Sequence, residues 1–166
     1  MADPNFARSV ILMVENEGGY VGFILNNPYL GVELSDVIED WQGESFGLCF
    51  GGPVEEETLH YIHTYEDLEG SLQVADNLYW GGDFNQIKEW NQRGILSSGR
   101  IKFFLGYSGW DLTQLQDEIK KKSWIKLPLN FNIFTDLSED LWKSILIDKG
   151  GEYKEIANYP VDPQLN

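Results

Sequence analysis

Residues 100–110, RIKFFLGYSGW, join an apolar run to a glycine-rich segment. The run at 100–107 is dense in branched and aromatic residues and predicts a buried strand, whereas GYSGW at 106–110 predicts a turn. Two further glycine doublets also follow apolar runs, in Gly51-Gly52-Pro53-Val54 and in Gly81-Gly82-Asp83. Glycine-rich elements therefore follow the predicted strands, and these elements are candidate functional sites.

The rest of the chain predicts a mixture of strands and helices. Apolar runs predict strands at 7–14, 20–25, 46–50, 59–65, 72–80 and 124–127. Helical spacing predicts helices at 34–41, after Asp83, after Asp111 and at 138–148, the last ended by Gly150-Gly151. Asp83 and Asp111 each have a Gln three residues later, the pattern of a capped helix start. Grouped strands with irregularly inserted helices predict an α+β fold with a mostly antiparallel sheet.

Length and composition indicate one domain spanning 1–166. A chain of 166 residues with 42% hydrophobic residues can form one substantial core. No apolar stretch approaches the roughly 20 residues needed to span a bilayer, and no leader pattern opens the chain, so we expect a cytoplasmic protein without a membrane role. The single cysteine, Cys49, excludes an internal disulfide and is expected to be an inert core residue.

Charge is divided unevenly along this acidic chain. Residues 1–85 hold sixteen acidic residues and one basic residue, Arg8, whereas residues 86–166 hold eleven of each kind. The whole net charge of −15 therefore belongs to the first half. Duplex binding needs Lys and Arg to neutralise phosphates. We therefore expect no direct sequence-specific DNA binding, and the acidic half favours a basic protein partner.

Each glycine element has a structural and a functional interpretation. The Gly51-Gly52 doublet is either a tight turn or a backbone that a ligand approaches, and the turn is favoured. In GYSGW, Ser108 offers a hydroxyl ahead of a helix start, where free amides attract anions, but a packing turn anchored by Trp110 is favoured. The segment does not have the spacing of a nucleophile elbow around Ser108.

No metal or cofactor site is expected. His60 and His63 are three residues apart, so on a strand they point to opposite faces and cannot share an ion. The acidic run at 55–57 lacks ordered ligand spacing and is most simply a solvated loop. Cys49 has no positive neighbourhood in the local sequence that would make its thiol reactive.

Several motifs together resemble the YqgE/AlgH family. They are DPNFARSVILMVEN, GFILNNP, FGGPV followed by His63, GYSGW with QLQDEI and SW, and EDLWKSIL with NYPVDPQLN. Their order covers the chain nearly end to end. The resemblance implies a bacterial protein with a sheet curled into a pseudo-barrel and flanking helices, and no established activity. Some members are labelled transcriptional regulators.

One departure from the family pattern concerns the start of the chain. Family members usually carry an apolar strand before the Asp-Pro segment, whereas here Met1 and Ala2 lead straight into Asp3-Pro4. We therefore expect a single domain of this type that lacks the family's first strand. A sheet edge left open in this way would invite pairing with a second chain.

Two classes of function remain open, and we favour the first. The first is a non-enzymatic regulatory or protein-interaction role, because no acid–base pair is visible in the sequence. The second is a small-molecule binder or enzyme whose pocket lies at the glycine-rich turns. Its predicted lining is Asn26, Asn27, Gly51, Gly52, His63, Gly82, Tyr107, Ser108, Gly109 and Trp110. Because strand ends on one side of a curled sheet converge, we expect the segments at 26–27, 51–52 and 107–110 to line one concave surface near His63.

Overall fold

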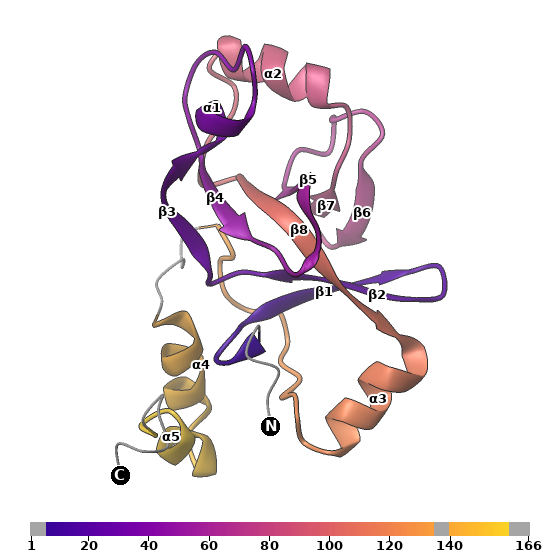
Figure 1. Ribbon diagram of the computed structural model, residues 1–166, viewed down its shortest axis with the longest axis vertical. Helices are drawn as coiled ribbons and strands as arrows, with labels where there is room; N and C mark the ends of the chain where they lie inside the picture. The colour runs from indigo at the N-terminus through magenta and orange to yellow at the C-terminus, as the bar shows by residue number, and fades with distance from the viewer. Residues whose placement is uncertain (1–5, 135–139, 160–166) are drawn as a thin grey trace.

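The computed structural model describes residues 6–134 and 140–159. The elements are β1 (Ile11–Asn16), β2 (Gly19–Ile24), β3 (Pro28–Glu33), α1 (Leu34–Val37), β4 (Gly47–Phe50), β5 (Val54–His63), β6 (Leu72–Ala75), β7 (Leu78–Trp80), α2 (Phe84–Gln92), β8 (Ile101–Asp111), α3 (Leu112–Lys120), α4 (Leu141–Lys149) and α5 (Glu152–Ile156). The α+β class is confirmed. The sheet nearly closes into a barrel, with α1 and α2 at one end and α3, α4 and α5 at the other (Figure 1).

The strand β8 organises the sheet. The strand order is β1-β2-β8-β5-β7-β6, with β4 also paired to β8 and β3 paired to β4. Every pair is antiparallel except β4 with β8. The first part of β8 lies between β4 and β5, and its last four residues pair with β2. One long strand therefore connects the β1–β2 hairpin to the rest of the sheet.

Both faces of β8 are buried, against two different cores. Phe103 contributes to a core with Leu34, Leu48 and Ile87, under α1 and α2. Phe104, the next residue, contributes to a core on the other face that includes Phe23. Because successive side chains of a strand point to opposite faces, the unbroken apolar run of β8 supplies both cores.

Three backbones meet where β8 passes the Gly51-Gly52 doublet. The Gly51 amide donates to the Leu105 carbonyl at 2.8 Å, and the Gly51 carbonyl accepts from the Ile24 amide at 3.0 Å. A Cβ on Gly51 would overlap the Gly106 carbonyl, and one on Gly52 would overlap Ser108 Oγ and the Tyr107 backbone. The doublet lacks side chains because another backbone occupies their space. This supports the structural interpretation of the doublet.

The two predicted helix starts are confirmed, but not their reciprocal caps. Asp83 accepts from the amides of Asn85 and Gln86, and Asp111 accepts from the Gln114 amide at 2.7 Å. The side chain of Gln86 instead accepts from the Glu69 amide, and that of Gln114 donates to Glu118. Each aspartate therefore caps its helix alone. Gln86 connects α2 to Glu69, whereas Gln114 bonds within α3.

Replacing Asp111 with alanine is expected to lower the free energy of unfolding by about 0.5–2 kcal/mol, because the Gln114 amide loses its acceptor. Urea unfolding measures the change. Asp111→Asn keeps a capping oxygen and should recover most of the loss. An Asp111→Ala midpoint equal to that of the wild type would contradict this role.

Several predicted boundaries are wrong. GYSGW is not a turn but the end of β8, because pairing with β2 extends it. The run at 72–80 forms a hairpin, β6 and β7, rather than one strand, and the segment at 124–127 has no strand. The strand β3 and the helix α5 were not predicted, and α1 covers only part of the predicted 34–41. The acidic run 55–57, expected to be a loop, lies in β5, which begins at Val54 rather than at 59. Two predictions lie outside the described residues: the start of the last helix at 138, and the lack of the family's first strand before the Asp3-Pro4 segment.

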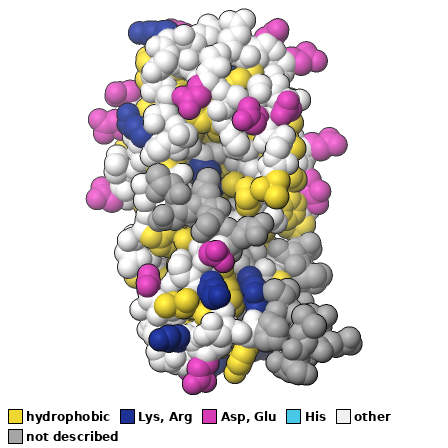
Figure 2. All heavy atoms as spheres, turned by 90° about the vertical axis from the view of Figure 1, so that its left-hand side faces the viewer, with side chains coloured by type: hydrophobic (Ala, Val, Ile, Leu, Met, Phe, Trp, Pro, Cys, Tyr) yellow, Lys and Arg dark blue, Asp and Glu magenta, His cyan; other side chains and the backbone are white. Residues whose placement is uncertain are grey.

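The surface reflects the division of charge. In the face shown in Figure 2, acidic side chains are most numerous over the upper part, whereas basic side chains occur in both the upper and the lower part. In the described part of the chain, no helix has the length and apolar character needed to cross a membrane.

Candidate functional site

A cavity lies where β8 ends and α3 begins. Its volume is about 350 Å³, which falls at the lower end of the range for small-ligand sites. The lining comes from the segment before β1, the turn after Gly52, β8, α3 and the loop after α3. These residues are Phe6, Pro53, Val54, Ser108, Gly109, Trp110, Gln114, Glu118, Ser123 and Trp124. Of this lining, Glu118 alone carries a charge.

Three aromatic rings form a corner in this cavity. The ring centroids of Phe6 and Trp110 are 5.4 Å apart, and those of Phe6 and Trp124 are 5.7 Å apart. Trp110 and Trp124 are 5.8 Å apart with ring planes at 89°. Rings at right angles place an edge against a face, the arrangement that the charge distribution of aromatic rings favours. The corner is therefore a mutually braced set of apolar walls.

Glu118 on α3 holds the two tryptophans. Its Oε2 accepts from the indole N–H of Trp124 at 2.7 Å and from that of Trp110 at 3.1 Å. Its Oε1 accepts from the Gln114 side chain at 3.0 Å. Burial alone would raise the pKa of Glu118, but these hydrogen bonds and the nearby Lys121 lower it below its ordinary value. Glu118 is therefore an anion that orients both indoles.

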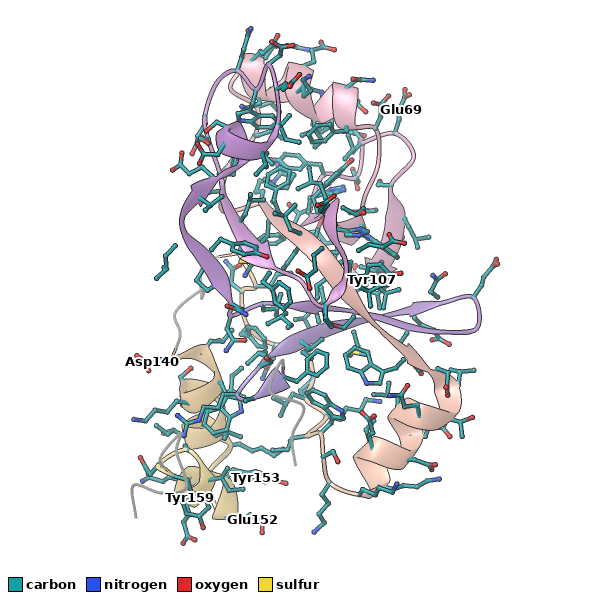
Figure 3. All side chains as sticks on the ribbon, in the orientation of Figure 1. Glu69, Tyr107, Asp140, Glu152, Tyr153 and Tyr159 are labelled. Carbon is teal, nitrogen blue, oxygen red and sulfur yellow. The ribbon has the colours of Figure 1, made fainter. Side chains whose placement is uncertain are left out.

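Two serines, Ser108 and Ser123, line this cavity, and Ser108 has no base paired with it. Ser108 is buried, and its Oγ has no hydrogen-bond partner among the described residues. His60 packs against Tyr107 at 5.5 Å between ring centroids. Tyr107 precedes Ser108 on β8, so the two side chains lie on opposite faces of the strand, and Figure 3 shows Tyr107 beside β8 at mid-height. The geometry therefore does not assemble a serine–histidine pair.

The two asparagines predicted to line a pocket instead form hydrogen bonds with neighbouring backbone segments. Asn26 Oδ1 accepts from the Val10 amide at 2.8 Å, and Asn26 Nδ2 donates to the Arg8 carbonyl at 2.9 Å. The Asn27 carbonyl accepts from the Phe50 amide. Neither asparagine is part of the lining of the aromatic cavity. Asn26 connects the end of β2 to the segment before β1, and Asn27 connects it to the end of β4.

His63 is buried on the face opposite His60, as the strand spacing predicted. Its Nδ1 accepts from the Tyr65 amide at 3.1 Å, so Nε2 carries the proton donated to the Gly81 carbonyl at 2.8 Å. Burial lowers the pKa of His63 despite these two bonds. His63 is thus a neutral histidine in the core. The carbonyl of Gly82 accepts from the Tyr61 hydroxyl at 2.6 Å.

The predicted site residues are therefore only partly brought together. Ser108, Gly109 and Trp110 line the aromatic cavity, with Gly52 and Tyr107 packed behind Ser108. Asn26, Asn27, Gly51, His63 and Gly82 have structural contacts elsewhere. In the described part of the chain, no three His, Cys, Asp or Glu side chains lie close enough to hold a metal ion.

A second, more polar cavity of about 520 Å³ lies near the start of β8. Its lining residues are Thr64, Tyr65, Glu66, Asp67, Asn77, Trp90, Arg93, Ile95 and Arg100. The Arg100 guanidinium lies 4.0 Å from the Tyr65 ring centroid and donates to Thr64 Oγ1. Arg93 forms an ion pair with Glu89 at 3.2 Å. Both cations are therefore already engaged within the protein.

Sequence analysis did not single out Phe6, Glu118 or Trp124. One signal was available for two of them: Trp110 and Trp124 flank a single short helix, and Glu118 lies on it between them. Phe6 had no such signal, because it is more than a hundred residues away from Trp110 along the chain.

The fold and cavity define a class: an α+β protein with a nearly closed sheet and an aromatic cavity beside its central strand. A model of the AlgH-like family matches residues 1–154, and the chain belongs to that family. A UPF0301 protein of Cytophaga hutchinsonii is 39% identical, covering 100% of this chain and 93% of the relative. One from Chlorobium limicola is also 39% identical, covering 100% and 90%.

Two solved structures share the fold. The solution structure of AlgH from Pseudomonas aeruginosa is similar with a TM-score of 0.72 and 24% identity, over 98% of this chain and 89% of that one. The crystal structure of a Corynebacterium diphtheriae protein is similar with a TM-score of 0.75 and 23% identity, over 96% and 86%. At these identities the likeness establishes the fold alone.

Proposed function

We propose that this protein is a non-enzymatic interaction protein with a regulatory role, and that it binds a basic protein partner through the aromatic cavity. The observation that carries the proposal is the corner of Phe6, Trp110 and Trp124 around the anionic Glu118. Rigid aromatic walls with one polar anchor are typical of binding surfaces. Ser108 has no hydrogen-bonded base, so it is not arranged as the nucleophile of an acyl transfer.

The charge of the chain supports a basic partner. The net charge of −15 arises from residues 1–85, which include the acidic run 55–57 directly after the cavity residues Pro53 and Val54. An acidic surface speeds encounter with a basic partner and excludes acidic ones. We also propose a cytoplasmic location and a regulatory role for this protein.

A second candidate function is small-molecule binding at the 520 Å³ cavity. Tyr65, Trp90 and Arg100 give it aromatic and cationic walls suited to a planar anion. Glu66 and Asp67 line the same cavity and oppose an anion, and Arg100 already bonds Thr64. We therefore rank this function second.

The proposed interaction is tested with a synthetic peptide that alternates lysine and glycine, titrated into ¹⁵N-labelled protein. We expect saturable shifts of amides at 108–124 and 53–57. The control variant Trp124→Ala keeps the net charge of −15 but removes one wall of the cavity, so it should lose most of the binding. Equal binding by Trp124→Ala would mean that charge alone attracts the peptide, and the proposed docking site would be wrong.

The isolated chain is expected to show no specific duplex binding at physiological salt, because residues 1–85 have one basic residue for sixteen acidic ones. A fluorescence titration with labelled duplexes measures this. Weak binding that disappears as salt rises is the generic phosphate contribution. Saturable submicromolar binding that persists at higher salt would contradict the prediction.

A further inference from the structure

We propose that the aromatic cavity recognises a lysine side chain of the partner, whose ammonium group lies against the ring faces and beside Glu118. The inference rests on the proposed function and names the chemical group that binds in the cavity. It is carried by the ring geometry, by the hydrogen bonds of Glu118 and by the charge of the lining.

The corner geometry suits a compact cation. Trp110 and Trp124 meet at 89°, and Phe6 lies within 5.7 Å of both ring centroids. A cation placed in such a corner interacts with several ring faces at once, and tryptophan is the strongest of the aromatic partners. Because both indoles are held by Glu118, the rings do not need to be ordered when the cation enters.

The electrostatics of the lining favour a cation over an anion. Glu118 provides the charge of the cavity and remains ionised. The start of α3 would otherwise attract an anion, but the Asp111 carboxylate already accepts from the Gln114 amide there. Lys121 lies near enough to Glu118 to help lower its pKa, so an incoming cation competes with this residue.

The hydrogen bonds of Glu118 favour lysine over arginine. Oε2 accepts from both indoles and Oε1 accepts from Gln114, so the carboxylate has no pair of free oxygens for the parallel bonds of a guanidinium fork. An ammonium group is a point charge on a slender stem and needs no such pair. Its stem fits the apolar walls from Val54 and Phe6.

The buried Ser108 gives the cavity a polar group whose hydroxyl oxygen has no hydrogen-bond partner among the described residues. This Oγ lies against Gly52, at the wall of the cavity. A buried hydroxyl without a hydrogen bond is unfavourable, so an ammonium donor that reaches it, directly or through water, would satisfy it.

The test uses Nα-acetyl-lysine N-methylamide, followed by the indole N–H signals of Trp110 and Trp124 in ¹⁵N-labelled protein. We expect saturable shifts of both indoles with a dissociation constant on the order of millimolar, as for a single small cation. The Nε-acetyl derivative has the same stem without the charge and should bind at least about tenfold more weakly, because the cation–π and carboxylate attractions are lost.

Matched variants separate the charge of Glu118 from its role in packing. Glu118→Gln retains an oxygen that accepts from the indoles but removes the charge, and it should weaken lysine binding about five- to tenfold. Asp117→Asn makes the same change of net charge on the same helix, outside the cavity, and should bind like the wild type. Lys121→Gln removes the competing cation and should bind more tightly. A circular dichroism melt confirms that each variant is folded.

The outcomes distinguish this inference from the proposed function. Equal indole shifts with the Nε-acetyl derivative would overturn lysine recognition, while peptide binding lost in Trp124→Ala would still support the docking site. Binding of the single amino acid without binding of the lysine–glycine peptide would overturn the protein-interaction proposal and support amine recognition. Absence of any indole shift with the lysine compound at about 10 mM, roughly ten times a millimolar constant, would overturn the inference.

Discussion

Gly106→Ala is expected to lower the free energy of unfolding by about 3 kcal/mol or more. Gly106 has a φ of 71°, and a Cβ at this position would overlap the Gly52 carbonyl and lie 3.0 Å from the Val54 carbonyl. Both neighbours are backbone atoms, so neither can move aside by rotating a side chain. The substitution therefore combines an unfavourable backbone conformation with overpacking at the point where β8 passes the glycine doublet.

Gly47→Ala provides the matched control. Gly47 also lies in a strand, β4, but a Cβ there meets nothing within 4 Å. The free energy of unfolding of Gly47→Ala should differ from that of the wild type by less than about 1 kcal/mol, in either direction. Urea unfolding of both variants measures the difference. Equal midpoints for Gly106→Ala and Gly47→Ala would show that the backbone crossing tolerates a methyl group and that this account of the glycines is wrong.

The contribution of Lys102 to the free energy of unfolding is expected to rise with pH. Its Nζ donates to the Leu25 carbonyl at 2.6 Å and to the Ile133 carbonyl at 3.4 Å, and the side chain is buried beside Phe104. Burial lowers the pKa of Lys102 from 10.5 to about 8, although Cys49 acts in the opposite direction. A lysine in the unfolded chain keeps its proton to higher pH. Between pH 8 and 10.5 the unfolded state therefore binds more protons, so stability from this group rises with pH.

The variant Lys102→Met isolates this contribution. The free energy of unfolding of the wild type minus that of Lys102→Met should increase by about 2–3 kcal/mol from pH 7 to pH 10. Urea unfolding across this range measures it, and Lys126→Met controls for the loss of an exposed lysine. A difference between wild type and Lys102→Met that does not change with pH, or that falls as pH rises, would contradict burial of a charged Lys102.

The elements that depend on local contacts were predictable from the sequence. Asp83 and Asp111 begin their helices because a carboxylate and amides two or three residues later are always close together. The hairpin of β1 and β2 was predictable because a short polar turn joins two apolar runs. The opposite orientations of His60 and His63 followed from strand geometry alone.

The course of β8 beyond Gly106 was not predictable in the same way. GYSGW has the composition of a turn, and its glycines match turn preferences. The segment is extended because β2 supplies hydrogen-bonding partners for Ser108, Gly109 and Trp110. The distant partner decides the structure here, since unpaired backbone groups are costly in a buried strand.

The sequence by itself determined the α+β class, the capped helices, the confinement of net charge to residues 1–85 and the lack of an internal disulfide. The tertiary structure alone decided that the glycine doublet packs against β8 and that Phe6 joins Trp110, Trp124 and Glu118 around one cavity. The reason is the range of the contacts. Caps, hairpins and charge depend on neighbours along the chain, whereas the cavity depends on how β8 carries Trp110 past a segment more than a hundred residues away.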